Sequence, residues 1–384
     1  MSPNKELSWL GGLEGKVFRF IGVLEKTGTS GRYLPCRNGA TRYGRTAELG
    51  FSCFALKVYH TFGWWDSLSG QRKKEWIEHI ESYQVSRNLI DSKYEGAYVD
   101  PVLIEFLRRP SLHRTLSWIR TTSMLEIVRS SFTGKQLQTY ERVIMAETKQ
   151  AIATLAQIGA QIKTLFSGYP QTPSEVDKFM TSVDWDLPWG AGGQTASLAV
   201  FLSTLAPNSL ACGDIVTLKS SIAQHYENLA DPNTGGYFLS RTPDHGLLVN
   251  GAMKVLTALD WLNIPIHYSR ELIDTTLSRK PRSDGCHLVD SVYVLYRCSL
   301  QTDYKKREVE SYLIECAGMI KRHHHSDGGF SFSVGQAQKW YYGLPISRGL
   351  AEGDLHGTTL LVWALVMIGH VCCPGKYHWN VIRP

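Results

Sequence analysis

The chain has 384 residues, of which 43% are hydrophobic and 20% charged, values that are ordinary for a globular protein with a large core. Its formal net charge of +6 is mild: it suits a small anionic substrate and does not indicate nucleic-acid binding. No apolar run approaches the roughly 18–20 residues that span a bilayer, and residues 1–14 lack the apolar stretch of a secretory signal. Eight cysteines without a Cys-x-x-Cys pair favour reduced thiols and a cytoplasmic protein.

Apolar residues recur with the helical period along most of the chain, and strand signals are scarce. Six segments are apolar on nearly every side, which predicts helices packed on all faces: 48–62, 118–130, 194–205, 247–262, 288–298 and 356–368. Between them lie amphipathic segments, typical of an outer layer: 70–83, 135–162, 214–229, 269–277 and 304–320. A sixth outer helix could come from the N-terminal segment or from the tail.

Glycine-containing turns precede the inner segments at a regular spacing. Gly193, Gly236, Gly285 and Gly329 follow one another at intervals of 43, 49 and 44 residues. A period of this size indicates one supersecondary unit repeated in a stacked or circular array. The pattern predicts an all-α fold, an (α/α)6 toroid of six inner and about six outer helices.

No linker interrupts this pattern, so we expect a single toroid domain over residues 1–384. Within it, residues 1–45 would form an N-terminal helix and a basic loop, and residues 46–384 the helical-pair repeats.

Two turns resemble the Gln-Asp-x-x-Gly-Gly-Phe/Trp motif of the prenyltransferase and squalene-cyclase repeat superfamily. They are Asp-Pro-Asn-Thr-Gly-Gly-Tyr-Phe at 231–238 and Ser-Asp-Gly-Gly-Phe-Ser at 326–331. The helix–turn–helix over 48–84 is similar to an opening unit of that repeat. The resemblance covers about residues 40–384 and implies a terpenoid cyclase-like toroid; it is more specific for the fold than for the chemistry.

Protein prenyltransferases hold zinc with an Asp-x-Cys pair on one inner helix and a histidine on the last. Asp290 and His356 are similar to two of these positions, but Val292 stands where the thiolate would be. One carboxylate and one imidazole are too few for a closed tetrahedral site. The sequence therefore argues against protein prenylation, and we predict no zinc and no other cofactor.

Asp290 and His356 are the first catalytic candidates. A carboxylate beside an imidazole raises the pKa of the histidine and sets its tautomer, which makes a general acid or base. The structural alternative is a buried ion pair that joins the last inner helix to the fifth.

Asp184 and Asp186 are the second catalytic candidates. They are the nearest match to the Asp-x-Asp-Asp acid motif of proton-initiated cyclases, without its third acid. Between Trp185 and Trp189 a carboxyl group could be desolvated, its pKa raised, and act as a Brønsted acid. Turn formation by the two aspartates is the alternative.

The first turns of the inner helices are expected to converge on one opening, where helix N-termini favour anions. Polar residues there can contact substrate or merely cap helices, and aromatic residues nearby can stabilise a carbocation, stack on sugars or fill the core. The predicted substrate-binding residues are Arg45, Glu48, Arg120, Gln194, Asn250, Tyr237, Tyr293, Trp189 and Trp340.

The leading hypothesis from the resemblance is a terpenoid cyclase-like or prenyltransferase-like enzyme that protonates an isoprenoid substrate. Asp290 or the pair Asp184 and Asp186 would be the acid, His356 its orienting partner, and Arg45 or Arg120 the contact to an anionic group such as a prenyl diphosphate. This enzyme would work without zinc.

Two other hypotheses stay open. One is a carbohydrate-active toroid, a lyase, hydrolase or epimerase, in which arginine holds a uronate and His356 or a tyrosine is the base. For hydrolysis, Asp290 and Glu48 would be the two separated carboxylates. The other is a non-catalytic toroid that binds a partner protein.

Overall fold

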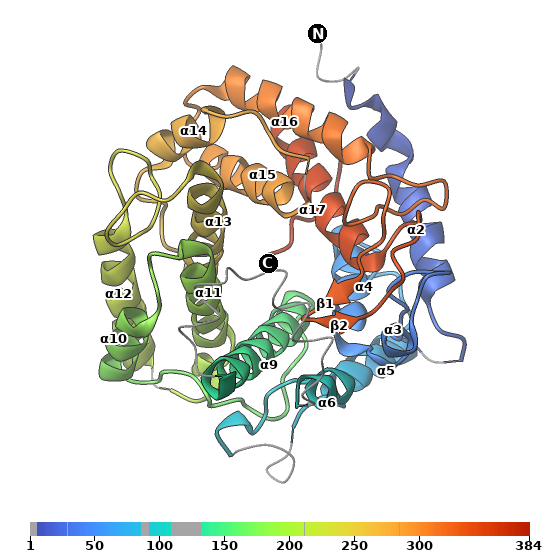
Figure 1. The fold of residues 1–384 in the computed structure, drawn as a ribbon, viewed down its shortest axis with the longest axis horizontal. Helices are drawn as coiled ribbons and strands as arrows, with labels where there is room; N and C mark the ends of the chain where they lie inside the picture. Colours follow the sequence, from blue (N-terminus) through green and yellow to red (C-terminus); the bar gives the residue numbers. More distant parts are fainter. Residues whose placement is uncertain (1–5, 29, 86–91, 109–131, 211, 284) are drawn as a thin grey trace.

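The computed structural model describes residues 6–28, 30–85, 92–108, 132–210, 212–283 and 285–384. Within these residues, six helices form a closed inner ring in which each helix packs against the next and the last returns to the first (Figure 1). In ring order they are α4 (Leu49–Thr61), α9 (Phe132–Gln157), α11 (Pro188–Thr204), α13 (His245–Leu262), α15 (Gly285–Ser299) and α17 (Leu355–Cys372). The ring confirms the predicted all-α toroid.

A second layer of helices surrounds this ring (Figure 1). Its members are α2 (Leu13–Leu24), α5 (Gly70–Glu81), α6 (Pro101–Arg108), α10 (Pro173–Ser182), α12 (Cys212–Leu229), α14 (Ser269–Leu277) and α16 (Lys306–Lys321). The N-terminal helix α2 takes the outer position that the sequence left open, and the apolar pattern did not indicate α10. Shorter elements are η1 (Ser8–Gly12), α3 (Arg42–Thr46), η2 (Ser92–Tyr94), η3 (Ala206–Asn208) and the antiparallel strands β1 (Trp340–Tyr341) and β2 (Leu344–Pro345).

The segment 135–162, predicted to belong to the outer layer, forms most of the inner helix α9, so that prediction is wrong. Its polar residues pointed to a solvent-facing side, yet Glu147 and Thr148 are only 1% and 0% exposed. An inner helix of a ring can carry a polar face toward the interior or toward a covering loop, which the apolar pattern does not distinguish from solvent. The predicted inner segment 118–130 lies outside the described residues and stays a prediction.

Two glycines of the repeated turns are required by backbone geometry. Gly235 has φ +69° and Gly328 has φ +93°, a region that residues with a side chain disfavour. At Gly328 a Cβ atom would also lie 2.6 Å from the carbonyl oxygen of Lys16 on α2. The turn therefore lets the chain before α17 pack closely against the outer layer.

The C-terminal segment 373–384 crosses the end of the ring at which α4, α9 and α13 finish. Its hydrogen bonds join Asn380 to Thr61, Arg383 to Gln157, Ile382 to Trp363 and Pro384 to Trp261. In Figure 1 the C-terminus lies at the centre of the ring. We therefore expect a ligand to enter from the opposite end, where the inner helices begin.

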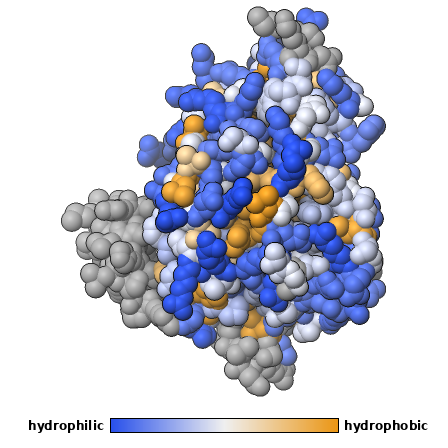
Figure 2. Space-filling model, turned by 90° about the vertical axis from the view of Figure 1, so that its right-hand side faces the viewer, coloured by the Kyte–Doolittle hydropathy of each residue, from blue (hydrophilic) through white to orange (hydrophobic). Residues whose placement is uncertain are grey.

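The outer surface on the side of α2 and α5 is largely hydrophilic, with several separate hydrophobic spots (Figure 2). Phe18 and Val23 of α2 contribute to the exposed apolar surface. Among the described helices, α17 is long and apolar enough to cross a membrane, and 78% of it is buried inside the ring. Such burial is typical of a core helix.

Candidate functional site

Three lysines on three inner helices are near enough for their charges to influence one another's pKa values. Lys57 lies on α4, Lys149 on α9 and Lys254 on α13. Lys254 and Lys57 each contribute to lowering the pKa of Lys149, and Lys254 contributes to lowering that of Lys57. Helices α4 and α13 lie on opposite sides of the ring (Figure 1), so the influence of Lys254 on Lys57 acts across the ring interior. We call the three residues the lysine cluster.

The lysine cluster has no carboxylate partner among the described residues. Lys254 Nζ lies 5.7 Å from the ring centroid of Trp189, a cation–π contact, and no hydrogen bond or ion pair of the Lys57 or Lys149 amine occurs in the described chain. Burial, followed by the neighbouring lysine charge, lowers the pKa of Lys57 to about 8. Buried cations are normally paired, so a bound anion would compensate the cluster.

His356, in the first turn of α17, lies beside the lysine cluster. Its Nδ1 is 2.8 Å from Oε1 of Gln338, and its ring is stacked between Phe54 and Phe332 at centroid distances of 4.4 and 5.4 Å. Burial, then the charges of Lys57 and Lys254, lower the pKa of His356 to about 3, so the imidazole is neutral at physiological pH. An amide oxygen only accepts hydrogen bonds; Nδ1 therefore carries the proton, and Nε2 keeps a lone pair that can accept one.

The β1–β2 hairpin covers the side of this site next to α9. The Tyr341 hydroxyl donates to Glu147 Oε1 at 2.8 Å, and its ring packs against Phe54. Burial, and then the charge of Asp100, raise the pKa of Glu147 to about 8, so this carboxyl group is protonated at neutral pH. At the turn, Tyr342 has φ +47° and remains 39% exposed. Bulky residues rarely adopt positive φ, and such strain clusters at functional sites.

Asp354 holds the loop that positions Gln338. Its carboxylate is 1% exposed and accepts hydrogen bonds from the backbone N–H groups of Gly357, Phe332 and Gln338 at 2.7, 2.7 and 3.0 Å. The Asp354 side chain therefore caps α17 and fixes the partner of His356 at the same time.

We expect Asp354→Ala to lower the free energy of unfolding by about 2–5 kcal/mol, because three backbone donors lose their acceptor in a buried place. Urea denaturation measures this loss. The matched control is Asp244→Ala at the exposed N-cap of α13, where the carboxylate accepts a single bond from Leu247 N and the expected loss is about 1 kcal/mol. Equal losses in the two variants would contradict the role given to Asp354.

The predicted pairing of Asp290 with His356 is wrong. Asp290 is buried on α15, with 5% exposure, but the contacts of His356 are with Gln338 and the two phenylalanine rings. The two residues lie on neighbouring helices, α15 and α17; a catalytic role for Asp290 without His356 stays a prediction.

The predicted desolvation of Asp184 and Asp186 is also wrong, because both are exposed. Asp184 Oδ1 accepts a hydrogen bond from the Asp186 backbone N–H at 3.1 Å, the turn-forming role that the sequence left as the alternative. Trp189, just inside α11, is 49% exposed and joins the site through its contact with Lys254.

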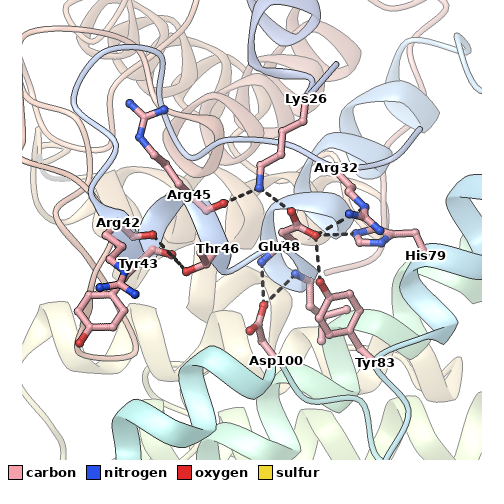
Figure 3. Close-up of polar contacts among 11 residues, drawn as sticks. Lys26, Arg32, Arg42, Tyr43, Arg45, Thr46, Glu48, His79, Tyr83 and Asp100 are labelled. Carbon is pink, nitrogen blue, oxygen red and sulfur yellow. Dashed lines mark hydrogen bonds and ion pairs between the residues drawn. The ribbon is translucent and has the colours of Figure 1, made fainter. Parts of the chain in front are cut away.

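Glu48 and Arg45 belong to a different cluster, at the start of α4 (Figure 3). Glu48 forms ion pairs with Lys26 and Arg32 and lies 3.7 Å from His79 Nε2, while the Arg45 side chain is exposed and its carbonyl oxygen accepts from Lys26 Nζ. Glu48 thus ties the N-terminal loop to α4 and is not among the contacts of His356.

The remaining predicted binding residues are dispersed. Tyr237 and Tyr293 are buried, each 1% exposed, and their hydroxyl groups contact His267 Nδ1 and Asp260 Oδ2. Gln194 and Asn250 are half-buried on α11 and α13, Trp340 is 47% exposed on β1, and Arg120 lies outside the described residues. Trp189 contacts Lys254, whose charge also acts on His356; the roles of the other described candidates stay predictions.

The lysine cluster was missed by reasoning from the sequence. Lys57 and Lys254 are isolated charges in otherwise apolar stretches, 49–59 and 247–259, and this was the available signal. Lys149 gave no such signal, because its segment 135–162 was predicted to belong to the outer layer, where a lysine is expected to face solvent.

No family model matches the chain, and no curated protein matches it. A solved GH76 α-mannanase of Bacteroides thetaiotaomicron is similar with a TM-score of 0.44 and 10% identity, over 97% of this chain and 98% of that chain. A possible member of the GH105 family from Salmonella enterica subsp. enterica serovar Paratyphi A is similar with a TM-score of 0.41 and 12% identity, over 97% and 94%. Neither is named as a prenyltransferase or a cyclase, and similarities this low transfer no activity to this chain.

Proposed function

We propose that the chain is an enzyme that acts on an anionic carbohydrate, a uronate-bearing sugar, and moves the proton on the carbon next to the carboxylate, as a lyase or an epimerase does. The observation that carries the proposal is the lysine cluster, three amines without a carboxylate partner in the described chain, beside the neutral His356. The free thiols of the described cysteines support a cytoplasmic location.

The lysine cluster supplies what this reaction needs electrostatically. Removing a proton next to a carboxylate places a second negative charge on that group, and the reaction is slow unless fixed positive charges stabilise it. Lys57, Lys149 and Lys254 would hold the carboxylate before and during this step. Because they lie in a poorly solvated place, their effect is larger than that of lysines in water.

His356 is the proposed base. Its Nε2 lone pair is available because Nδ1 is bound to Gln338, and stacking on Phe54 and Phe332 fixes the plane of the ring. A base must be unprotonated to accept a proton, and the lowered pKa of His356 meets this condition. At the entrance, the exposed face of Trp189 can stack on a sugar ring.

A hydrolase needs two carboxyl groups on either side of the glycosidic bond, and the structure does not favour this. Of the two carboxylates predicted for that role, Glu48 is paired with Lys26 and Arg32. The contacts of His356 are with Gln338, Phe54 and Phe332 rather than with Asp290. Proton transfer by His356 therefore fits the site better than acid-assisted hydrolysis.

The lysine cluster also disfavours the isoprenoid hypothesis. A carbocation formed in the ring interior would lie among three amines, whose positive charges repel it. The predicted acids Asp184 and Asp186 are exposed and so lack the desolvation expected of a Brønsted acid. Asp184 Oδ1 instead accepts a turn hydrogen bond from the Asp186 backbone N–H.

The test is hydrogen exchange in D2O, followed by NMR, with oligouronides as substrates and matched neutral oligosaccharides as controls. We expect deuterium to enter at the carbon next to the carboxylate of the uronide and not in the neutral sugar. A lyase would in addition give the ultraviolet absorbance of an unsaturated product. Absence of exchange in every oligouronide, with binding of a prenyl diphosphate instead, would overturn the proposal.

A further inference from the structure

The β1–β2 hairpin is fitted to the inner ring through the side chain of Tyr341, which is 6% exposed. The Tyr341 hydroxyl donates to Glu147 on α9 at 2.8 Å. The same ring lies against Gly50 on α4, where a Cβ atom would come within 2.7 Å of Tyr341 Cζ. A glycine at position 50 therefore leaves the room that the tyrosine fills, and a larger residue there would displace the hairpin.

The hairpin fixes the amide of Gln338, which lies just before β1. Gln338 Nε2 donates to the carbonyl oxygen of Trp340 at 2.8 Å. The main chain of Gln338 is held as well, because its carbonyl oxygen accepts from Ser347 Oγ at 2.6 Å and its N–H donates to Asp354 at 3.0 Å. The oxygen and nitrogen of an amide are told apart by their partners, and a carbonyl oxygen only accepts. The NH2 group must therefore face Trp340, which turns the amide oxygen toward His356.

The orientation of this amide decides which nitrogen of His356 carries the proton. A neutral imidazole has a single N–H, and the partner of the ring determines where it lies. Gln338 Oε1 is 2.8 Å from Nδ1, so the proton is on Nδ1. With the amide reversed, the NH2 group would donate to Nδ1, and the proton would move to Nε2. Nε2 could then no longer accept a proton from a substrate.

We propose that the β1–β2 hairpin sets the state of the base and acts through Gln338 as a positioning residue. The Trp340 carbonyl fixes the Gln338 amide, and the amide holds the His356 proton on Nδ1. The inference rests on the proposed function, in which Nε2 of His356 takes the proton from the substrate. It deepens that function, because proton transfer then requires the hairpin to be docked on the ring.

The tautomer can be measured without substrate, by 15N NMR at pH 7 of protein labelled at histidine. Protonated and unprotonated ring nitrogens differ in 15N shift, and the signals of His356 are those missing in His356→Gln. We expect the wild type to carry the proton on Nδ1. Gln338→Met keeps a similar size without the amide, so both tautomers should appear. With one hydrogen bond lost, kcat for uronide exchange should fall roughly two- to tenfold, with KM little changed. The matched control is Gln84→Met, which loses an amide that donates to two backbone carbonyls; it should keep the wild-type tautomer and kcat.

A second variant tests the hairpin itself. Gly50→Ala changes neither Gln338 nor His356, but its Cβ atom would overlap the Tyr341 ring. We expect the His356 tautomers to become mixed, as in Gln338→Met. The matched control is Gly22→Ala on the outer helix α2, where a Cβ atom would meet nothing within 4 Å and the tautomer should stay that of the wild type. Circular dichroism checks that each variant is folded.

A proton on Nε2 of His356 in the wild type overturns the proposal, and so does a pure Nδ1–H tautomer in either folded variant, Gln338→Met or Gly50→Ala. The outcome is separable from that of the hydrogen-exchange test. An Nδ1 proton that both variants redistribute, without exchange in any uronide, sinks the proposed function and keeps the control of His356 by the hairpin. Exchange in a uronide by a wild type that is protonated on Nε2 does the reverse.

Discussion

Replacing His356 with glutamine should lower kcat for uronide hydrogen exchange by roughly 10²–10⁴-fold, the usual contribution of a general base, with little change in KM. The substitution removes the Nε2 lone pair but keeps a planar group that can reach Gln338 and lie between Phe54 and Phe332. Steady-state exchange rates in D2O measure the effect.

The matched control is His225→Gln on the outer helix α12, where the imidazole pairs with the exposed Asp177. This variant should exchange at the wild-type rate. Full activity in His356→Gln would remove His356 from the mechanism, whereas equal loss in both variants would point to a general effect of losing a histidine.

The acid side of the pH profile gives a second readout for His356. The base works in its neutral form, and its pKa in the free protein is lowered to about 3. The ratio kcat/KM should therefore hold as pH falls through 6.5, where an ordinary histidine becomes protonated, and decline only near pH 3–4. A bound carboxylate favours the imidazolium, so kcat should decline at a higher pH than kcat/KM does. An acid limb of kcat/KM near 6.5 would contradict the assignment.

The second large effect is expected from Lys57→Met and Lys254→Met, each of which removes one cation from the lysine cluster. Loss of one charged contact in a partly buried site costs about 1.5–3 kcal/mol, so each Kd for a uronide should rise roughly ten- to a hundredfold. Calorimetric titration measures Kd. Lys74→Met, at an exposed position, should leave it unchanged.

These two variants should be at least as stable as the wild type, in contrast to most substitutions in a core. Methionine fills a similar volume, and its introduction removes a charge, buried at Lys57 and half-buried at Lys254, that has no carboxylate partner in the described chain. A rise in the free energy of unfolding together with a loss of affinity is the signature of a binding site rather than of a structural lysine. A variant that loses stability and affinity together would argue for a structural role.

Loss of the Lys57 proton as pH rises should weaken uronide binding but increase the free energy of unfolding. Its pKa is lowered from 10.5 to about 8, so uronide affinity should fall as pH rises through 8, where the cation is lost. Between pH 8 and 10.5 the unfolded chain binds more protons at this position than the native chain, so the contribution of Lys57 to the free energy of unfolding increases with pH. The difference between wild type and Lys57→Met, measured by urea denaturation at pH 7 and pH 10, isolates this contribution. A difference that does not narrow with pH would contradict the lowered pKa.

The sequence by itself determined the helical period, the glycine turns and hence the toroid. Five of the six inner helices correspond to the segments 48–62, 194–205, 247–262, 288–298 and 356–368, because helices packed on every side must be apolar all round. The same pattern misplaced α9, since a polar stripe looks alike whether it faces solvent or the interior of a ring. Trp189 and His356 were found as candidates from their positions at helix starts.

Only the tertiary structure decided which of these residues act together. Lys57, Lys149 and Lys254 are about a hundred residues apart, and each alone looks like an ordinary lysine. Ring closure brings their charges near one another, and no carboxylate of the described chain pairs with them. Asp290 and His356 are the opposite case. They lie on the adjacent helices α15 and α17, but the predicted pair between their side chains does not form. A helix fixes the position of a residue along the chain, but the rotation of the helix about its axis fixes where the side chain points, and that rotation is set by packing against all neighbours at once.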